Sequence, residues 1–202
     1  MSIIEVDCSY INEDLNYKEI IECYNTLSYS KLCTKLDKIF IINEKKKGSG
    51  AYGAVYDAMI IDTNDESVPY TICTVKIQSY KKDDDKAKQE LINEIIATEY
   101  LRSLELDYIP EIYGYNWINT KNHIFGLIFM EKLDETLGTK IDKINLDKEL
   151  HTKNDEIEKL NNLINKSYDI LLYLHKKGIY HCDAHFNNYM INKSGKLFII
   201  DY

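Results

Sequence analysis

The 202-residue sequence lacks a long N-terminal apolar run, an excess of basic residues and closely paired cysteines. Each absence excludes a class of protein. The first ten residues, MSIIEVDCSY, carry acidic groups and no apolar core, so they are neither a signal peptide nor a membrane span. The net charge of −8 excludes the broad basic face that a nucleic acid or an anionic membrane requires of its partner.

The cysteines are odd in number, scattered, and without a C-x-x-C pair: Cys8, Cys23, Cys33, Cys73 and Cys182. This distribution predicts a reduced, intracellular and cytoplasmic protein without a disulfide framework or structural zinc. The excess of Ile, Lys, Asn and Tyr is typical of an AT-rich genome, such as that of a large DNA virus or a protist. For a viral protein, the expected location would be the host cytoplasm. With 45% hydrophobic and 29% charged residues, the chain suits one or two small globular domains.

Hydrophobic periodicity divides the chain into three parts. Residues 1–36 have rough helical spacing and predict a helical extension. Residues 37–133 read as five strands, with one helix inserted over KKDDDKAKQELINEIIATEYLRSL. Residues 134–202 begin with a polar stretch and continue as a long helix, a loop and a hairpin. The predicted fold class is α+β, with a five-stranded first lobe and the beginning of a mainly helical second lobe.

The clearest predicted helix runs from Asn154 to Lys177. Asn154 is a suitable N-cap, and Gly178 is a natural stop after the last turn. Its apolar residues form one stripe at helical spacing: Ile157, Leu160, Leu163, Ile164, Leu171 and Leu174.

A glycine-rich segment, GSGAYGAVY, spaces Gly48, Gly50 and Gly53 as G-x-G-x-x-G, with Val55 two residues on. The same spacing occurs in dinucleotide folds, but there a helix must follow. Here AVYDAMIID alternates like a strand. The pattern favours a hairpin whose backbone N–H groups, including that of Ser49, cover nucleotide phosphates, because glycine lets the backbone approach closely. An ordinary glycine-rich hairpin is the alternative.

Lys76 lies within the apolar strand pattern YTICTVKI, where an ammonium group needs partners to offset its desolvation. A phosphate and a carboxylate would be such partners. The alternative is a lysine that faces water.

The segment HCDAHFNN places Asp183 two residues after His181 and Asn188 five residues after Asp183. Phosphoryl transfer requires a carboxylate to receive a hydroxyl proton and an amide oxygen to hold a metal ion. Asp201, in the closing FIIDY, lies 18 residues after Asp183. A polar turn and a strand-terminal aspartate form the alternative interpretation.

Four signals follow one another along the chain: the glycine-rich segment, Lys76, HCDAHFNN and FIIDY. Together they resemble the ATP site of the protein kinase family, and the resemblance runs from about residue 37 to the end of the chain. The resemblance implies ATP and Mg²⁺ as cofactors, with Lys76 on the phosphates. It also implies a glutamate of the following helix that fixes Lys76, for which Glu90, Glu94 and Glu99 are the candidates. Glu94 fits best, because the residues three, four and seven positions later lie along the same predicted buried side, and solvated glutamates are the alternative. It implies Asp183 as the catalytic base, and Asn188 and Asp201 as metal ligands.

Two further segments carry this resemblance. LIFMEKL looks like the strand that leads into the adenine-contacting hinge, which implies that Met130, Glu131 and Leu133 border the nucleotide. YIPEIYGY and the closing IIDY look most like the casein kinase I and vaccinia-related kinase branch. The leading hypothesis is therefore a serine/threonine-type protein kinase, or its amino-terminal fragment, with an unknown protein substrate.

The sequence departs from the family pattern at three points. Cys182 replaces the Arg of H-R-D, so the protein should not need a phosphorylated activation segment. His185 replaces the usual Lys in the catalytic set, and H-x-D-x-H-x-x-N also resembles small-molecule kinases of the aminoglycoside and choline type. No Gly follows Tyr202, and the rest of the second lobe is missing. If the gene product ends at Tyr202, we expect the apolar stripe on the 154–177 helix to be exposed in the isolated chain, which implies a partner that covers it or a defect. A truncated pseudokinase that binds nucleotide or protein is a further alternative.

Overall fold

The computed structural model describes most of the chain and divides it into two compact units. The residues described are 4–7, 17–31, 38–50, 53–62, 70–104, 106–146 and 154–201. The first unit contains Met1–Asn93 and Glu111–Lys132, and the second contains Glu94–Pro110 and Leu133–Tyr202.

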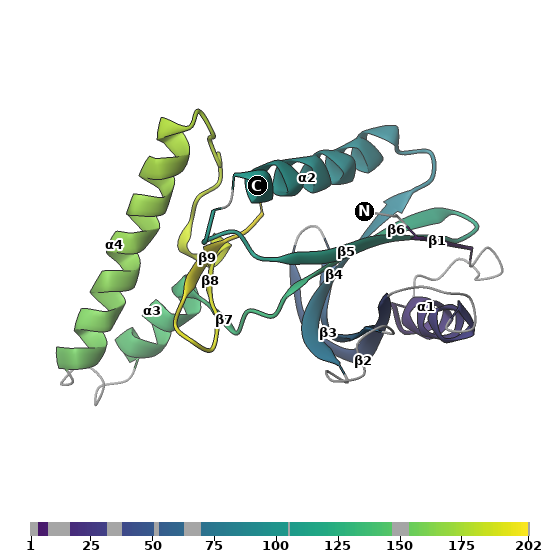
Figure 1. Ribbon diagram of the computed structural model, residues 1–202, viewed down its shortest axis with the longest axis horizontal. Coiled ribbons are helices and arrows are strands. Elements are labelled where there is room, and N and C mark those ends of the chain that lie inside the picture. The colour runs from purple at the N-terminus through teal and green to yellow at the C-terminus, as the bar shows by residue number, and fades with distance from the viewer. Residues whose placement is uncertain are drawn as a thin grey trace. The chain divides into compact units, whose positions relative to one another are not determined.

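The first unit is built on a six-stranded sheet with the order β1-β5-β6-β4-β3-β2 (Figure 1). Five of its strands pair antiparallel, which confirms the predicted five-stranded arrangement. The sixth strand, β1, pairs in parallel with β5, within a segment for which the sequence predicted only helix. The strands are β1 Ile4–Asp7, β2 Lys38–Gly50, β3 Gly53–Asp62, β4 Thr71–Lys81, β5 Ile112–Asn119 and β6 His123–Glu131.

One face of this sheet is covered by the helix α1, Tyr17–Lys31 (Figure 1). Apolar side chains of α1 and of the alternate positions of β2, β3, β4 and β6 form a single buried core. At its centre, the Phe129 ring lies 4.2 Å from the Phe40 ring and 5.9 Å from the Tyr24 ring, measured between centroids. The helix α1 is therefore part of the core of the first unit.

Polar contacts fix the position of α1 on the sheet. The Asn25 side chain accepts a hydrogen bond from the backbone N–H of Ile42 (2.9 Å) and donates one to the Ile42 carbonyl (2.8 Å). Asn116 in β5 donates to the Tyr24 hydroxyl at 2.5 Å. These bonds satisfy backbone and side-chain groups that burial removes from water.

We expect Asn25→Ala to lower the free energy of unfolding by about 1–3 kcal/mol, because it removes both bonds to Ile42 and leaves that backbone unit without them. Urea denaturation measures the loss. Thr26→Ala on the same helix is the matched control, since Thr26 is exposed and bonds only within α1. Equal stability of the two variants would contradict a fixed position for α1.

The helix α2, Asp85–Ser103, forms where the sequence predicted it and begins with an aspartate that suits the positive end of the helix dipole. The boundary between the two units falls within it, after Asn93.

The second unit contains the three-stranded sheet β7-β8-β9, the helices α3 and α4, and a short 3-10 helix, η2. The sequence predicted α4 and the β8–β9 hairpin, but not α3. The elements are β7 Glu135–Thr136, α3 Leu137–Leu146, α4 Asn154–Lys176, η2 Phe186–Asn188, β8 Tyr189–Ile191 and β9 Leu197–Ile199.

The helix α4 ends at the predicted glycine. Gly178 has φ +77, a left-handed conformation that glycine adopts without strain, and its N–H donates to the His175 carbonyl at 2.9 Å. The N–H of Ile179 donates to the Leu174 carbonyl at 2.9 Å. These two bonds satisfy carbonyls that the last turn would otherwise leave without partners.

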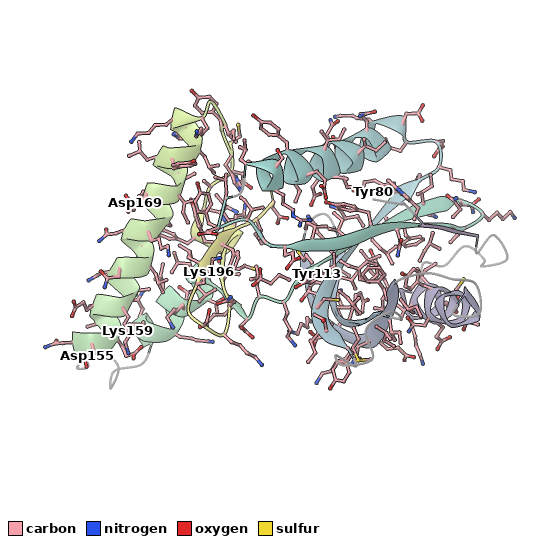
Figure 2. All side chains as sticks on the ribbon, viewed as in Figure 1. Tyr80, Tyr113, Asp155, Lys159, Asp169 and Lys196 are labelled. Atoms are coloured by element: carbon pink, nitrogen blue, oxygen red, sulfur yellow. The ribbon has the colours of Figure 1, made fainter. Side chains whose placement is uncertain are left out.

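The apolar stripe of α4 is not exposed, which corrects the expectation from the sequence. Leu160 and Leu174 are buried in a core that α3, β8 and β9 share, and Leu163, Ile164 and Leu171 pack against that core. The β8–β9 hairpin and the helix α3, which the sequence did not predict, cover the stripe. Charged side chains, Asp155, Lys159 and Asp169, project from α4 on its outer side (Figure 2).

The cysteine prediction also needs a correction, because Cys23 is disulfide-bonded. Its partner lies outside the described residues. Cys73 and Cys182 are free, the first buried and the second exposed. Spacing along the chain could not reveal this bond, because a disulfide depends on the distance between two residues in the fold.

Candidate functional site

The glycine segment forms the tip of the β2–β3 hairpin. Gly50 pairs with Gly53, and Gly48 pairs with Val55, while residues 51–52 lie outside the described range. Gly53 has φ +155, and a Cβ built on it would collide with the Ile77 carbonyl oxygen of the neighbouring strand. Only glycine fits this position, so β3 and β4 can approach closely beside the tip.

Lys76 lies on β4, in register with Val55 on β3 and Ile128 on β6. Residues directly opposite in adjacent strands share a sheet face, as do residues two apart in one strand. We call this side, opposite to the one that α1 covers, the Lys76 face. Its members on these three strands are Val55, Asp57, Thr74, Lys76, Ile128 and Met130.

The other two predicted hinge residues lie elsewhere. Glu131 pairs with Cys73 and therefore belongs to the opposite sheet face, and its backbone N–H donates to the Glu111 carbonyl at 2.7 Å. Leu133 belongs to the second unit, where its side chain is buried.

On the Lys76 face, Asp57 contacts one lysine of β2 and one lysine that directly follows β6. Its Oδ1 lies 3.1 Å from Lys47 Nζ and 3.0 Å from Lys132 Nζ. Burial alone would raise the pKa of the Asp57 carboxyl, but the hydrogen bonds to Lys132 and Lys47 outweigh it and lower this pKa below its ordinary value. The sequence analysis did not identify this cluster. The available signal was the spacing of Val55 and Asp57, which lie two residues apart in a predicted strand and therefore on the same face of it.

The HCDAHFNN loop is tied to the segment before Asp201 by hydrogen bonds within the second unit. The Asn188 side-chain amide donates to the Asp183 carbonyl at 3.0 Å, and the Ile200 N–H donates to the Asn188 carbonyl at 2.9 Å. Buried His181 places Nε2 2.7 Å from the Ile200 carbonyl, and because a carbonyl only accepts, Nε2 carries the proton. The loop and the segment that ends at Asp201 are therefore fixed to each other.

Two residues in this region have left-handed backbone conformations that non-glycine residues rarely adopt. Cys182 and Asp201 both have φ +60. Such conformations cost free energy and persist only where the surroundings impose them. Each lies beside a residue of the hydrogen-bond network, Cys182 next to His181 and Asp201 next to Ile200, so the network imposes both.

Asp183 presents its carboxylate to solvent, with 74% of the side chain exposed. His185 Nε2 lies 3.7 Å from Asp183 Oδ2, and the His185 N–H donates to the Asp183 carbonyl at 3.0 Å. The backbone of Asp183 is thus held while its carboxylate is accessible to a second reactant.

The three glutamates considered as partners of Lys76 differ in exposure. Glu90 and Glu99 are exposed and form ion pairs along the helix with Lys86 and Arg102, both at 3.9 Å. Glu94 is half-buried, as expected from its position among the less exposed residues of α2. Glu94 belongs to the second unit and Lys76 to the first, so their pairing stays a prediction.

Each unit therefore gathers part of the predicted site. The first brings together the glycine hairpin, Val55, Lys76 and Met130, and the second brings together Asp183, His185, Asn188 and Asp201. Within the described ranges, no group of three or more His, Cys, Asp and Glu side chains gathers as a metal site. Asn188 and Asp201 supply two oxygen-bearing side chains, which fits Mg²⁺, because this ion is usually held by one or two protein ligands together with phosphate and water.

Comparison with known proteins identifies the family. The family model described as "Protein kinase domain" matches residues 41–202, while no curated protein sequence matches the chain at a significant level. No helix in the described part of the chain is long and apolar enough to cross a membrane. The matched range includes the glycine hairpin, Lys76, the HCDAHFNN loop and Asp201. The chain therefore belongs to the protein kinase domain family, whose activity is phosphoryl transfer.

Proposed function

We propose that the protein transfers the γ-phosphoryl group of Mg·ATP to serine or threonine hydroxyls of a protein substrate. The observation that carries this proposal is the network of His181, Asn188 and Ile200, which holds the loop of Asp183 against the segment of Asp201. A base and a metal ligand held together in this way favour transfer, because positioning supplies much of the catalysis of this reaction. The likeness to the casein kinase I and vaccinia-related kinase branch belongs to the same proposal.

Asp183 acts as the general base in this proposal. Its exposed carboxylate accepts the proton of the incoming hydroxyl as the hydroxyl oxygen bonds to the γ-phosphorus and the bond from that phosphorus to ADP breaks. His185, when protonated, places a positive charge near the phosphoryl group, in the role that the family gives to lysine.

The nucleotide is held by the first unit in this proposal. The backbone of the Gly48–Gly53 hairpin covers the phosphates, and Lys76 contacts them. Val55 and Met130, on the same sheet face as Lys76, border the base. Mg²⁺ would be held by Asn188 and Asp201 and would neutralise phosphate charge.

The function is tested with radiolabelled ATP and Mg²⁺, with casein and histone as generic protein substrates beside an aminoglycoside and choline. We expect label on protein serine or threonine, and its loss when EDTA removes the metal. Label on the small molecules alone would overturn the proposal in favour of a small-molecule kinase. No label on any acceptor, with thermal stabilisation by ATP retained, would instead identify a nucleotide-binding pseudokinase.

A further inference from the structure

Thr74, on the Lys76 face, has a buried hydroxyl group. It lies two residues before Lys76 on β4, with Asp57 and Met130 directly opposite on the two neighbouring strands. The residue is only 8% exposed, and its hydroxyl oxygen has no hydrogen-bond partner among the described residues. A buried hydroxyl without a partner is rare in folded proteins.

The neighbours of Thr74 do not supply that partner. The Asp57 carboxylate across β3 binds Lys47 and Lys132. On the other side, Met130 offers only a thioether, which is a weak acceptor. The free chain therefore carries the cost of desolvating the hydroxyl, which a bound molecule with a suitable polar atom would recover.

The register indicates which part of a nucleotide would lie there. The glycine tip at Gly50–Gly53 is followed along the sheet first by the Val55–Lys76 level and then by the Asp57–Thr74 level. One such step is two residues, or about 6.6–6.8 Å. In a nucleotide whose phosphates lie at the tip and Lys76, the part furthest from the phosphates, which is the base, lies toward Thr74 and Met130.

We propose that the Thr74 hydroxyl forms a hydrogen bond with the base of the bound nucleotide and so helps to set base affinity. This inference rests on the proposed function, since it requires that the glycine hairpin and Lys76 bind the phosphates. The hydroxyl both donates and accepts, so it suits a purine edge, which offers ring nitrogens and an exocyclic group.

Thr74→Val tests the proposal, because valine keeps the β-branched shape and removes only the hydroxyl. We expect the ligand-free variant to melt higher by about 2–6 °C, since an unsatisfied buried group is gone. We also expect its affinity for Mg·ATP to fall about three- to tenfold, while its affinity for Mg·tripolyphosphate, which has no base, stays unchanged. Thr74→Ser should retain most of the ATP affinity, and Thr71→Val, at an exposed position of the same strand, should change neither affinity.

The outcomes separate this inference from the function beneath it. Wild-type protein that binds neither ATP nor tripolyphosphate would overturn the proposed nucleotide site itself, and the role of Thr74 with it. Wild-type protein that binds both, with Thr74→Val binding ATP equally well, would overturn only the role of Thr74. A Thr74→Val chain that melts lower than wild type and loses both affinities alike would show a structural hydroxyl, and would also overturn that role.

Discussion

Replacement of Asp183 by asparagine should lower the rate of phosphoryl transfer by roughly 10²–10⁴-fold, because an amide cannot accept the hydroxyl proton. The fold should survive, since the network uses the backbone N–H and carbonyl of Asp183, which asparagine retains. Transfer of label from ATP to a protein substrate measures the rate, and the melting temperature with and without Mg·ATP measures binding.

Asp169→Asn is the matched control for this substitution. Asp169 is an exposed aspartate on α4, in the same unit, and its side chain projects away from the network (Figure 2). Both variants lose one negative charge, so only the specific position differs. Equal activity of Asp183→Asn and Asp169→Asn would remove Asp183 from the mechanism.

The second large effect is expected in the core under α1. Phe129→Ala should lower the free energy of unfolding by about 3–5 kcal/mol, because Phe129 is fully buried between the Tyr24 and Phe40 rings and leaves a cavity. This loss is comparable to the whole stability of a marginal domain. Denaturant titration measures it.

Ile72→Ala provides the comparison, because Ile72 is 51% exposed on the neighbouring strand and its truncation should change stability by about 0.5 kcal/mol or less. Phe129 lies on the sheet face opposite to Lys76. The folded fraction of Phe129→Ala should therefore bind Mg·ATP with wild-type affinity. A small stability loss, close to that of Ile72→Ala, would mean that α1 does not cover this face in solution.

The parts of the fold that local pattern determines could be predicted from the sequence. The apolar residues of α4 recur at helical spacing along the 23 residues of the helix. The helix begins at Asn154, as the sequence predicted. The sequence of β3 alternates apolar and polar residues, and β3 pairs with both of its neighbours as an interior strand of a sheet does. In these segments, propensity, periodicity and turn residues agree with one another.

The missed features depend on contacts between distant residues. β1 is four residues long and pairs with Asn116 and its neighbours, far along the chain, so no local pattern marks it. Rough helical spacing predicted α1 but not that Asn25 would bond to the backbone of β2. The short helix α3 lies in a polar, lysine-rich stretch, where packing of Leu137 and Ile144 against the second core determines the structure.

The candidate site divides in the same way. The order and spacing of motifs singled out the residues of the HCDAHFNN loop and Lys76, because chemistry fixes residue type there. Spacing could not show that Asp57 forms ion pairs with two lysines or that the Thr74 hydroxyl lacks a partner, since both depend on strand register and side-chain burial. Glu94 is half-buried while Glu90 and Glu99 are exposed, and the choice of Glu94 as the partner of Lys76 stays a prediction.

The position of α1 affects where the chain can be shortened without exposing its core. The kinase family model begins at residue 41, downstream of α1, yet Ile20, Ile21 and Tyr24 of that helix are almost completely buried against the sheet. A fragment trimmed to residues 41–202 would lose Tyr24 and Phe40 and would present Phe129 to water, which favours aggregation. The buried core of the first unit therefore includes residues upstream of the range that the family model matches.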